Sequence, residues 1–226
     1  MFILIIIFLV LFFSFLFTPV LIRFSNNNSI FKKITERDIH SRNISNIGGV
    51  VIFSSFSFGV FLLYLFNYYN SIIIIDYHFF LIFAISFIFL IGLYDDIYML
   101  SFLFKFLFQF SLAFIFVYTF DLKIESFYGL FGYFNLSKNF LSFFSVFVFV
   151  FIMNSYNLVD GVDGLATSIG VFINLFFSFI FYLNDCYFDF YLSIILLTCL
   201  ASFFYFNKPP AKIFMGDSGS LFIGLI

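Results

Sequence analysis

The residues most able to do chemistry are carboxylates and amides that interrupt long apolar runs. Asn154, Asn157, Asp160 and Asp163 recur at every third position between two hydrophobic segments, and a glycine follows each aspartate. On an α- or 3₁₀-helical turn this spacing brings the side chains toward one face, and the glycines let a ligand approach the backbone closely. Polar groups at the end of a membrane span are costly. The run therefore favours a functional site over a loop that only ends a helix.

A carboxylate pair ends an earlier apolar run, where Asp95 and Asp96 stand side by side. Adjacent like charges repel each other, which favours a nearby cation or metal. Lys105 and Gln109 come next, one helical turn apart and inside an apolar segment. Lys105 could extend toward the membrane interface, or it could neutralise an acidic or phosphate-bearing cavity. The nearby Asp95 and Asp96 favour the second interpretation.

The most specific stretch is Asn207-Lys-Pro-Pro-Ala-Lys-Ile-Phe-Met-Gly-Asp-Ser-Gly-Ser220, which leads into the last apolar segment. Asp217 or Ser218 could simply cap a helix there. Alternatively, free N–H groups at the helix start would favour phosphate, and Asp217 would hold a Mg²⁺ ion that bridges phosphate oxygens. Hard oxygen ligands predict Mg²⁺, with Mn²⁺ as an alternative. The sequence has no Cys/His metal motif and no Walker lysine loop.

The composition excludes a soluble globular domain. Hydrophobic residues make up 64% of the 226 residues and charged residues only 10%, against about a quarter in globular proteins. The predicted fold class is an all-α polytopic membrane protein, with one integral domain over residues 1–226 in the lipid bilayer. The net charge of −2 says nothing about nucleic acid, and because no basic tract suggests such a partner, none is expected.

The apolar runs predict about eight transmembrane helices, the last of them incomplete. They fall near 1–22, 47–67, 79–94, 100–120, 139–155, 165–183, 190–206 and from 218 onward. Half of all Lys and Arg lie in the first polar loop, which the positive-inside rule makes cytoplasmic, with the N-terminus outside. Alternation then predicts cytoplasmic loops at about 23–46, 95–99, 154–164 and 207–217. Spans as short as 79–94 and 139–155 would set the carboxylates at the depth of lipid phosphates.

Taken together, these stretches resemble the polyprenyl-phosphate N-acetylhexosamine-1-phosphate transferases of glycosyltransferase family 4. This superfamily contains the undecaprenyl-phosphate GlcNAc-1-phosphate transferases and phospho-N-acetylmuramoyl-pentapeptide translocase. The similar motifs are Arg37-Asp-Ile-His40-Ser with Gly48-Gly49, Asp95-Asp96 with Lys105 and Gln109, the run from Asn154 to Ala166, and Pro210 to Ser220. The resemblance covers roughly residues 35–226, and its last two motifs are highly specific.

The resemblance implies an enzyme of the bacterial inner membrane with a cytoplasmic active site. Such an enzyme transfers a sugar 1-phosphate, here GlcNAc-1-phosphate or a related N-acetylhexosamine, from a UDP-amino sugar to undecaprenyl phosphate and releases UMP. This is the first membrane step of cell-wall or surface polysaccharide synthesis. A homodimer is compatible with the resemblance.

The resemblance also implies a role for each candidate residue. Catalysis is expected of Asp95, Asp96 and Asp217; substrate binding of Lys105, Asn154, Asp160, Asp163 and His40; and Mg²⁺ coordination of Asp217 and Asn157. Asp95 is expected to engage the lipid phosphate. Asp96 is expected to be held by Lys105 or by the water shell of the metal.

Two departures from the family pattern leave alternatives open. The Pro before the Gly-Gly pair is replaced by Ser45-Asn-Ile47, and the Pro-Thr-Met-Gly-Gly motif of the muramoyl-pentapeptide branch is missing, which argues against that branch. The chain also stops at Ile226, before the family's further helices and His-rich loop. A C-terminally truncated, non-catalytic fragment is therefore one alternative. A cation-coupled transporter is another, and it would need mid-span acids or paired broken helices.

Overall fold

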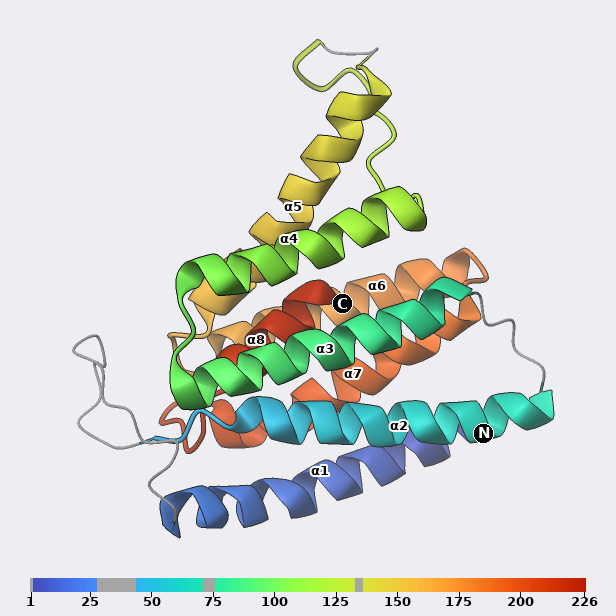
Figure 1. Cartoon of the computed structure of the whole chain (residues 1–226). Helices are drawn as coiled ribbons and strands as arrows, with labels where there is room; N and C mark the ends of the chain where they lie inside the picture. Colours follow the sequence, from blue (N-terminus) through green and yellow to red (C-terminus); the bar gives the residue numbers. More distant parts are fainter. Residues whose placement is uncertain (1, 28–43, 71–75, 133–135) are drawn as a thin grey trace.

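The computed structural model describes residues 2–27, 44–70, 76–132 and 136–226. This part of the chain forms eight α-helices (Figure 1): α1 Phe2–Asn27, α2 Gly48–Asn70, α3 Asp76–Tyr98, α4 Phe102–Thr119, α5 Lys138–Val159, α6 Leu165–Leu183, α7 Tyr187–Asn207 and α8 Gly216–Leu225. The first seven are long and apolar enough to cross a membrane, whereas α8 has only 10 residues. The predicted polytopic helical fold is confirmed. His40 lies outside the described residues.

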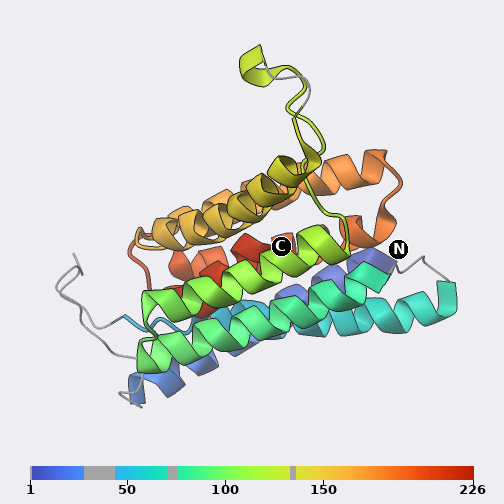
Figure 2. The same cartoon turned by 45° about the horizontal axis from the view of Figure 1, so that its top comes forward.

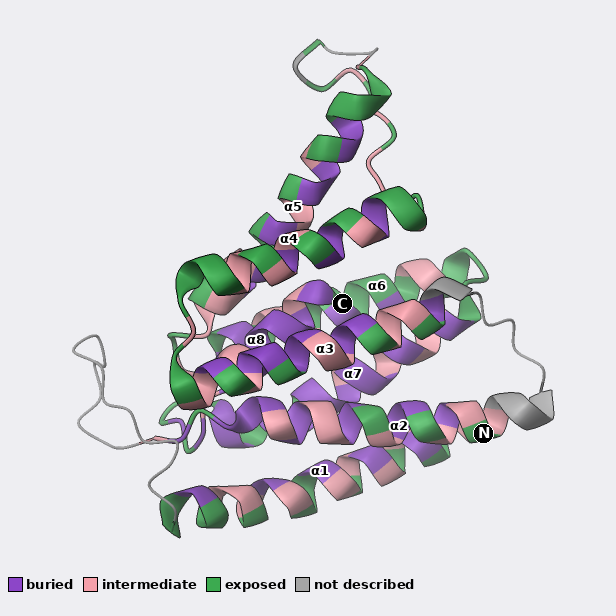
Figure 3. Ribbon diagram, in the orientation of Figure 1, coloured by how far each residue is buried: buried purple, intermediate pink, exposed green. Residues whose placement is uncertain are grey.

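The centre of the bundle is formed by α7 and α8. The helices α1, α2 and α6 pack along α7, while α2, α3 and α5 surround α8 (Figure 2). Figure 3 shows this arrangement as buried residues on α7 and α8 and exposed residues on the outer faces of α1, α4 and α5. Small polar residues let some of these helices approach closely, as where Ser202 of α7 donates a hydrogen bond to Ser14 of α1 at 2.6 Å.

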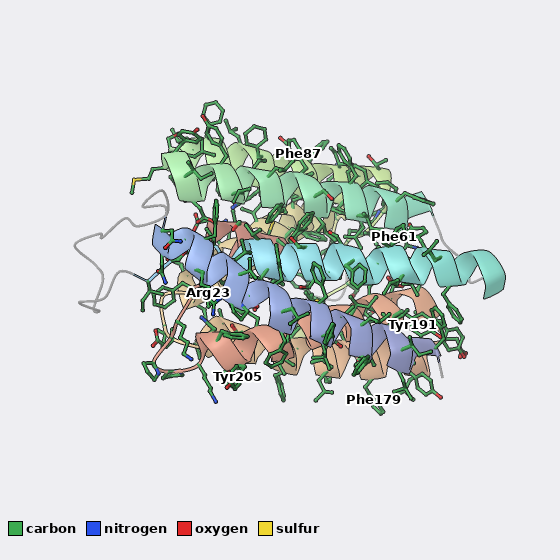
Figure 4. All side chains as sticks on the ribbon, turned by 90° about the horizontal axis from the view of Figure 1, so that it is seen from below. Arg23, Phe61, Phe87, Phe179, Tyr191 and Tyr205 are labelled. Atoms are coloured by element: carbon green, nitrogen blue, oxygen red, sulfur yellow. The ribbon has the colours of Figure 1, made fainter. Side chains whose placement is uncertain are left out.

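The outer faces carry large apolar side chains that a bilayer would cover. Phe61 and Phe179 are examples, exposed by 58% and 60% of their surface, and in Figure 4 Phe179 lies at the outer edge of the bundle. Within the helices, sequence periodicity carries little information, because an apolar residue suits both the protein interior and lipid. Polar residues are therefore the better guide to which helix faces meet.

Two helices extend further than the sequence predicts. Asp95 and Asp96 lie within the last turns of α3, and Asn154 and Asn157 lie within α5. The predicted loops at 95–99 and 154–164 are therefore partly helical, and the prediction of short spans is wrong. The helices do not end at these polar residues because neighbouring helices supply hydrogen-bond partners for them.

Candidate active site

The segment before α8 is held against the start of α2. Gly48 and Gly49 donate backbone hydrogen bonds of 2.8 and 2.7 Å to Phe214 and Met215, and Phe214 donates one of 2.9 Å to Ser45. Gly49 allows this approach, because a Cβ there would lie 2.3 Å from a backbone nitrogen of α8. The Gly-Gly pair of the sequence motif therefore serves close packing of α2 on α8, which brings Asp217 into the bundle.

Lys105 joins two of the predicted catalytic carboxylates. Its Nζ donates to Asp95 Oδ2 at 2.9 Å and to Asp217 Oδ2 at 2.8 Å. The three side chains are only 10–27% exposed, so their charges are weakly screened by water. The prediction that Lys105 neutralises an acidic cluster agrees with this geometry. Of the two partners expected for Asp96, Lys105 is wrong, because it pairs with Asp95 and Asp217 instead; the water shell of a metal stays a prediction.

Two amides of α5 complete this side of the cluster. Asn157 Nδ2 donates to Asp217 Oδ1 and to Ser220 Oγ, both at 2.8 Å. One turn earlier, Asn154 Nδ2 donates to Gln109 Oε1 of α4 at 2.5 Å. Gln109 is only 1% exposed, so this bond lies between packed helices. It ties α4 to α5 one helical turn from Lys105 and Asn157.

Asp96 and Asp160 are turned toward the backbone at the start of α8. Asp96 Oδ1 and Oδ2 accept hydrogen bonds from the N–H groups of Asp217 and Ser218 at 2.9 and 3.0 Å. Asp160 Oδ2 accepts one from Gly216 N–H at 2.9 Å. The expectation of free N–H groups for phosphate is therefore wrong for these three donors. Side chains from other helices already satisfy them.

Asp163 contacts the segment before α8, where its Oδ2 accepts a hydrogen bond of 3.0 Å from Ala211 N–H.

Asp160 follows the last turn of α5. Loss of hydration on burial raises the pKa of Asp160 well above its usual value, and the carboxylates of Asp217 and Asp96 raise it further, although the Gly216 N–H bond opposes the shift. The carboxyl group of Asp160 thus lies in an environment that disfavours its charge.

The donor set suits a hard cation. Asp95 and Asp217 offer carboxylate oxygens, and the Asn157 amide and the Ser220 hydroxyl lie beside Asp217. In the described residues, no three His, Cys, Asp or Glu side chains come together as a protein-only metal cage. Mg²⁺ does not need such a cage, since it usually takes one or two carboxylates together with substrate phosphates and water. The carboxylates of Asp95 and Asp217 are therefore ligands of the kind that Mg²⁺ takes, while Asn157 presents its Nδ2 to Asp217.

Three contributors were not among the predicted site residues. Gln109 belongs to one of the sequence motifs, and an amide inside an apolar segment is itself a signal of a polar contact. Ser220 stands in the Asp217 motif and donates to the Gly216 carbonyl oxygen at 2.9 Å. Gly216 has φ of +76° and would carry a Cβ 2.9 Å from an Asp96 oxygen. The position of Gly216 directly before Asp217 in the sequence motif was the signal that could have indicated its role.

The fold and the site together define a polytopic membrane protein whose acidic cluster is suited to phosphate and a cation. The model of glycosyl transferase family 4 matches residues 78–226. The chain belongs to this family, within the polyprenyl-phosphate hexosamine-1-phosphate transferase superfamily. The predicted family resemblance is thereby confirmed.

Similar curated proteins carry the name phospho-N-acetylmuramoyl-pentapeptide-transferase. The protein of Caldanaerobacter subterraneus subsp. tengcongensis is 45% identical over 87 residues, which cover 38% of this chain and 27% of that protein. The protein of Streptococcus agalactiae serotype III is 44% identical over 96 residues, covering 42% and 28%. That of Clostridium beijerinckii is 43% identical over 81 residues, covering 36% and 25%.

The matches span about a quarter of the length of these curated relatives. The names of the relatives also bear on the predicted branch. The missing Pro-Thr-Met-Gly-Gly motif argued against the muramoyl-pentapeptide branch, yet all three relatives carry that branch's name. The branch to which this chain belongs therefore stays a prediction.

Proposed function

We propose that this protein transfers a phosphorylated N-acetylhexosamine from a UDP-amino sugar to a polyprenyl phosphate in the membrane, releasing UMP. The observation that carries the proposal is the bridge of Lys105 between Asp95 and Asp217, next to Asn157. Phosphoryl transfer depends more on positioning and charge neutralisation than on a strong protein nucleophile. A half-buried ammonium between two carboxylates offers both functions.

In the proposed reaction, an oxygen of the lipid phosphate bonds to the phosphorus that carries the sugar. The bond from that phosphorus to the oxygen of the UMP phosphate breaks, and UMP leaves. Lys105 would hold the incoming phosphate, and Asp95 would orient Lys105 through their 2.9 Å contact. Asp217 and Asn157 would hold Mg²⁺, which would supply neutralisation of the phosphate charges.

For the sugar, the names of the relatives support phospho-N-acetylmuramoyl-pentapeptide over the GlcNAc-1-phosphate expected from the sequence. The test is a panel of radiolabelled UDP-sugars given with undecaprenyl phosphate to membranes that contain the full chain. We expect labelled lipid and UMP with UDP-N-acetylmuramoyl-pentapeptide. Labelling with UDP-GlcNAc alone would overturn the choice of sugar, and no labelling with any sugar would support a non-catalytic fragment.

The site is proposed to face the cytoplasm of the bacterial inner membrane. Support comes from Lys and Arg in the loops at this end, and Arg23 lies at the same end of the bundle in Figure 4. Single cysteines at positions 162 and 185, which are both exposed, in a variant without Cys186 and Cys199, would test the orientation in intact cells. An impermeant thiol reagent should label position 185 and spare position 162, and the reverse pattern would refute it.

The transporter alternative lacks support in the described helices. Their carboxylates lie in the first or last turns, such as Asp95 and Asp96 at the end of α3 and Asp189 at the start of α7. An ion pathway through the bilayer would place such groups near mid-span.

A further inference from the structure

The first backbone N–H groups of a helix have no acceptor within the helix. In α8 these are the groups of Gly216, Asp217 and Ser218, and the preceding residue Met215 offers no side-chain cap. All three N–H groups instead bind carboxyl oxygens from other parts of the chain: one of Asp160, at the end of α5, and two of Asp96, in α3. The start of α8 is therefore capped from two neighbouring helices.

We propose that Asp96 and Asp160 are positioning residues, which cap α8 from outside and thereby fix Asp217, and that neither touches the substrates. The inference rests on the proposed function for what Asp217 does, but the capping itself stands on contacts. It divides the acidic residues into two groups. Asp95 and Asp217 share Lys105 and face the reacting phosphates, whereas Asp96 and Asp160 accept hydrogen bonds from backbone N–H groups.

The geometry leaves Asp96 little freedom for another role. Both of its oxygens are engaged at 2.9 and 3.0 Å by consecutive N–H groups. Its carboxylate also packs against the Cα of Gly216, where an added Cβ would lie 2.9 and 3.0 Å from the two oxygens. Lys105 contacts Asp95 and Asp217 rather than Asp96.

Capping also explains how Asp217 is aimed. Its own N–H is bound by Asp96, while its side chain is bound by Lys105 and Asn157. Backbone and side chain are thus fixed from three helices, α3, α4 and α5. Moving the start of α8 by even an ångström would alter the distance between Asp217 and Lys105, and positioning errors of that size lower catalytic rates strongly.

The experiment measures backbone hydrogen exchange of the full chain in detergent, by mass spectrometry of peptides covering residues 211–220. The variants are Asp96→Ala and Asp160→Ala, which remove the accepting oxygens altogether, and the adjacent Asp95→Ala as control. A lost hydrogen bond of this kind is worth about tenfold in protection. We expect Asp96→Ala to speed the exchange of two amides in these peptides about tenfold, Asp160→Ala to speed that of one, and Asp95→Ala to leave all three amides at the start of α8 unchanged.

A second readout separates positioning from direct substrate contact. In membranes that release UMP, Asp96→Ala should raise the Mg²⁺ concentration for half-maximal rate, and high Mg²⁺ should restore part of that rate. Unchanged exchange in Asp96→Ala and Asp160→Ala would overturn the inference, as would loss of turnover in Asp96→Ala without a change in Mg²⁺ dependence. Because exchange requires no turnover, an inactive chain would defeat the proposed function alone. If Asp96→Ala fails to fold, Asp160→Ala, which removes the acceptor of a single N–H group, decides the question.

Discussion

Replacing Lys105 by Met tests the charge balance at the centre of the site. Met has nearly the length of Lys but no charge, so the change removes the ammonium that lies 2.9 Å from Asp95 and 2.8 Å from Asp217. Two carboxylates with little exposure would then lack their common partner. Breaking a buried pair by removing one partner costs about 3–5 kcal/mol. At roughly 2–4 °C per kcal/mol for a chain of this size, Tm should fall by about 6–20 °C.

The assay is thermal unfolding of the purified chain in detergent, with and without Mg²⁺. Because the variant keeps both carboxylates and loses the competing cation, Mg²⁺ should stabilise Lys105→Met more than the parent. Lys123→Met is the matched control, since its partner Asp121 is 78% exposed and such surface pairs contribute at most about 1 kcal/mol. Equal Tm values for Lys105→Met and Lys123→Met, with no response to Mg²⁺, would refute the reasoning.

Three further changes probe separate parts of the site. Asp217→Ala should abolish Mg²⁺-dependent UMP release by membranes, and near-normal release with the same Mg²⁺ requirement would contradict its role. Gln109→Leu should destabilise the chain by about 1 kcal/mol in thermal unfolding, because one N–H of the Asn154 amide loses its acceptor while the amide keeps its bond to the Val150 carbonyl; a neutral effect would show that the pair contributes nothing. Gly49→Ala should lower Tm, since the backbones of α2 and α8 must separate. Gly161→Ala is its control, with only one atom near its Cβ, at 3.8 Å, and an equal loss in both would argue against tight packing.

Much of the fold was predictable from the sequence, because few backbone structures can span a lipid bilayer. A run of about 20 apolar residues has to become a helix, since lipid cannot satisfy backbone polar groups. The meeting of Asp95, Asn157 and Asp217 was also predictable, because polar groups at one end of several helices gain by facing one another. The residues at which the helices end were less predictable from the sequence. Asp95 and Asp96 looked like the start of a loop, but Lys105 and the N–H groups of α8 let the helix continue past them.

The roles of individual carboxylates were not predictable from the sequence. Asp95 and Asp96 are chemically identical neighbours, and one binds Lys105 while the other caps α8. The difference arises from the 100° turn between successive helical residues, together with the positions of α4 and α8. The partners of Asp160 and Asp163 were not predictable either, because they are the backbone N–H groups of Gly216 and Ala211. Almost every residue carries such a group, so the sequence does not indicate which one a carboxylate binds.

The division of the acids also bears on how the cluster could hold phosphate. With Asp96 engaged by backbone N–H groups, the groups left to face a substrate are Asp95, Asp217 and Lys105. If these three are ionised, they leave one net negative charge, which would repel a phosphate. A divalent cation reverses the sign of that sum, so the same side chains would then attract phosphate. The charges of this chain therefore favour a divalent cation at the proposed phosphate site. Lys105→Met, which makes the cluster more negative, should raise the affinity for Mg²⁺ in a binding titration and lower the proposed affinity for polyprenyl phosphate.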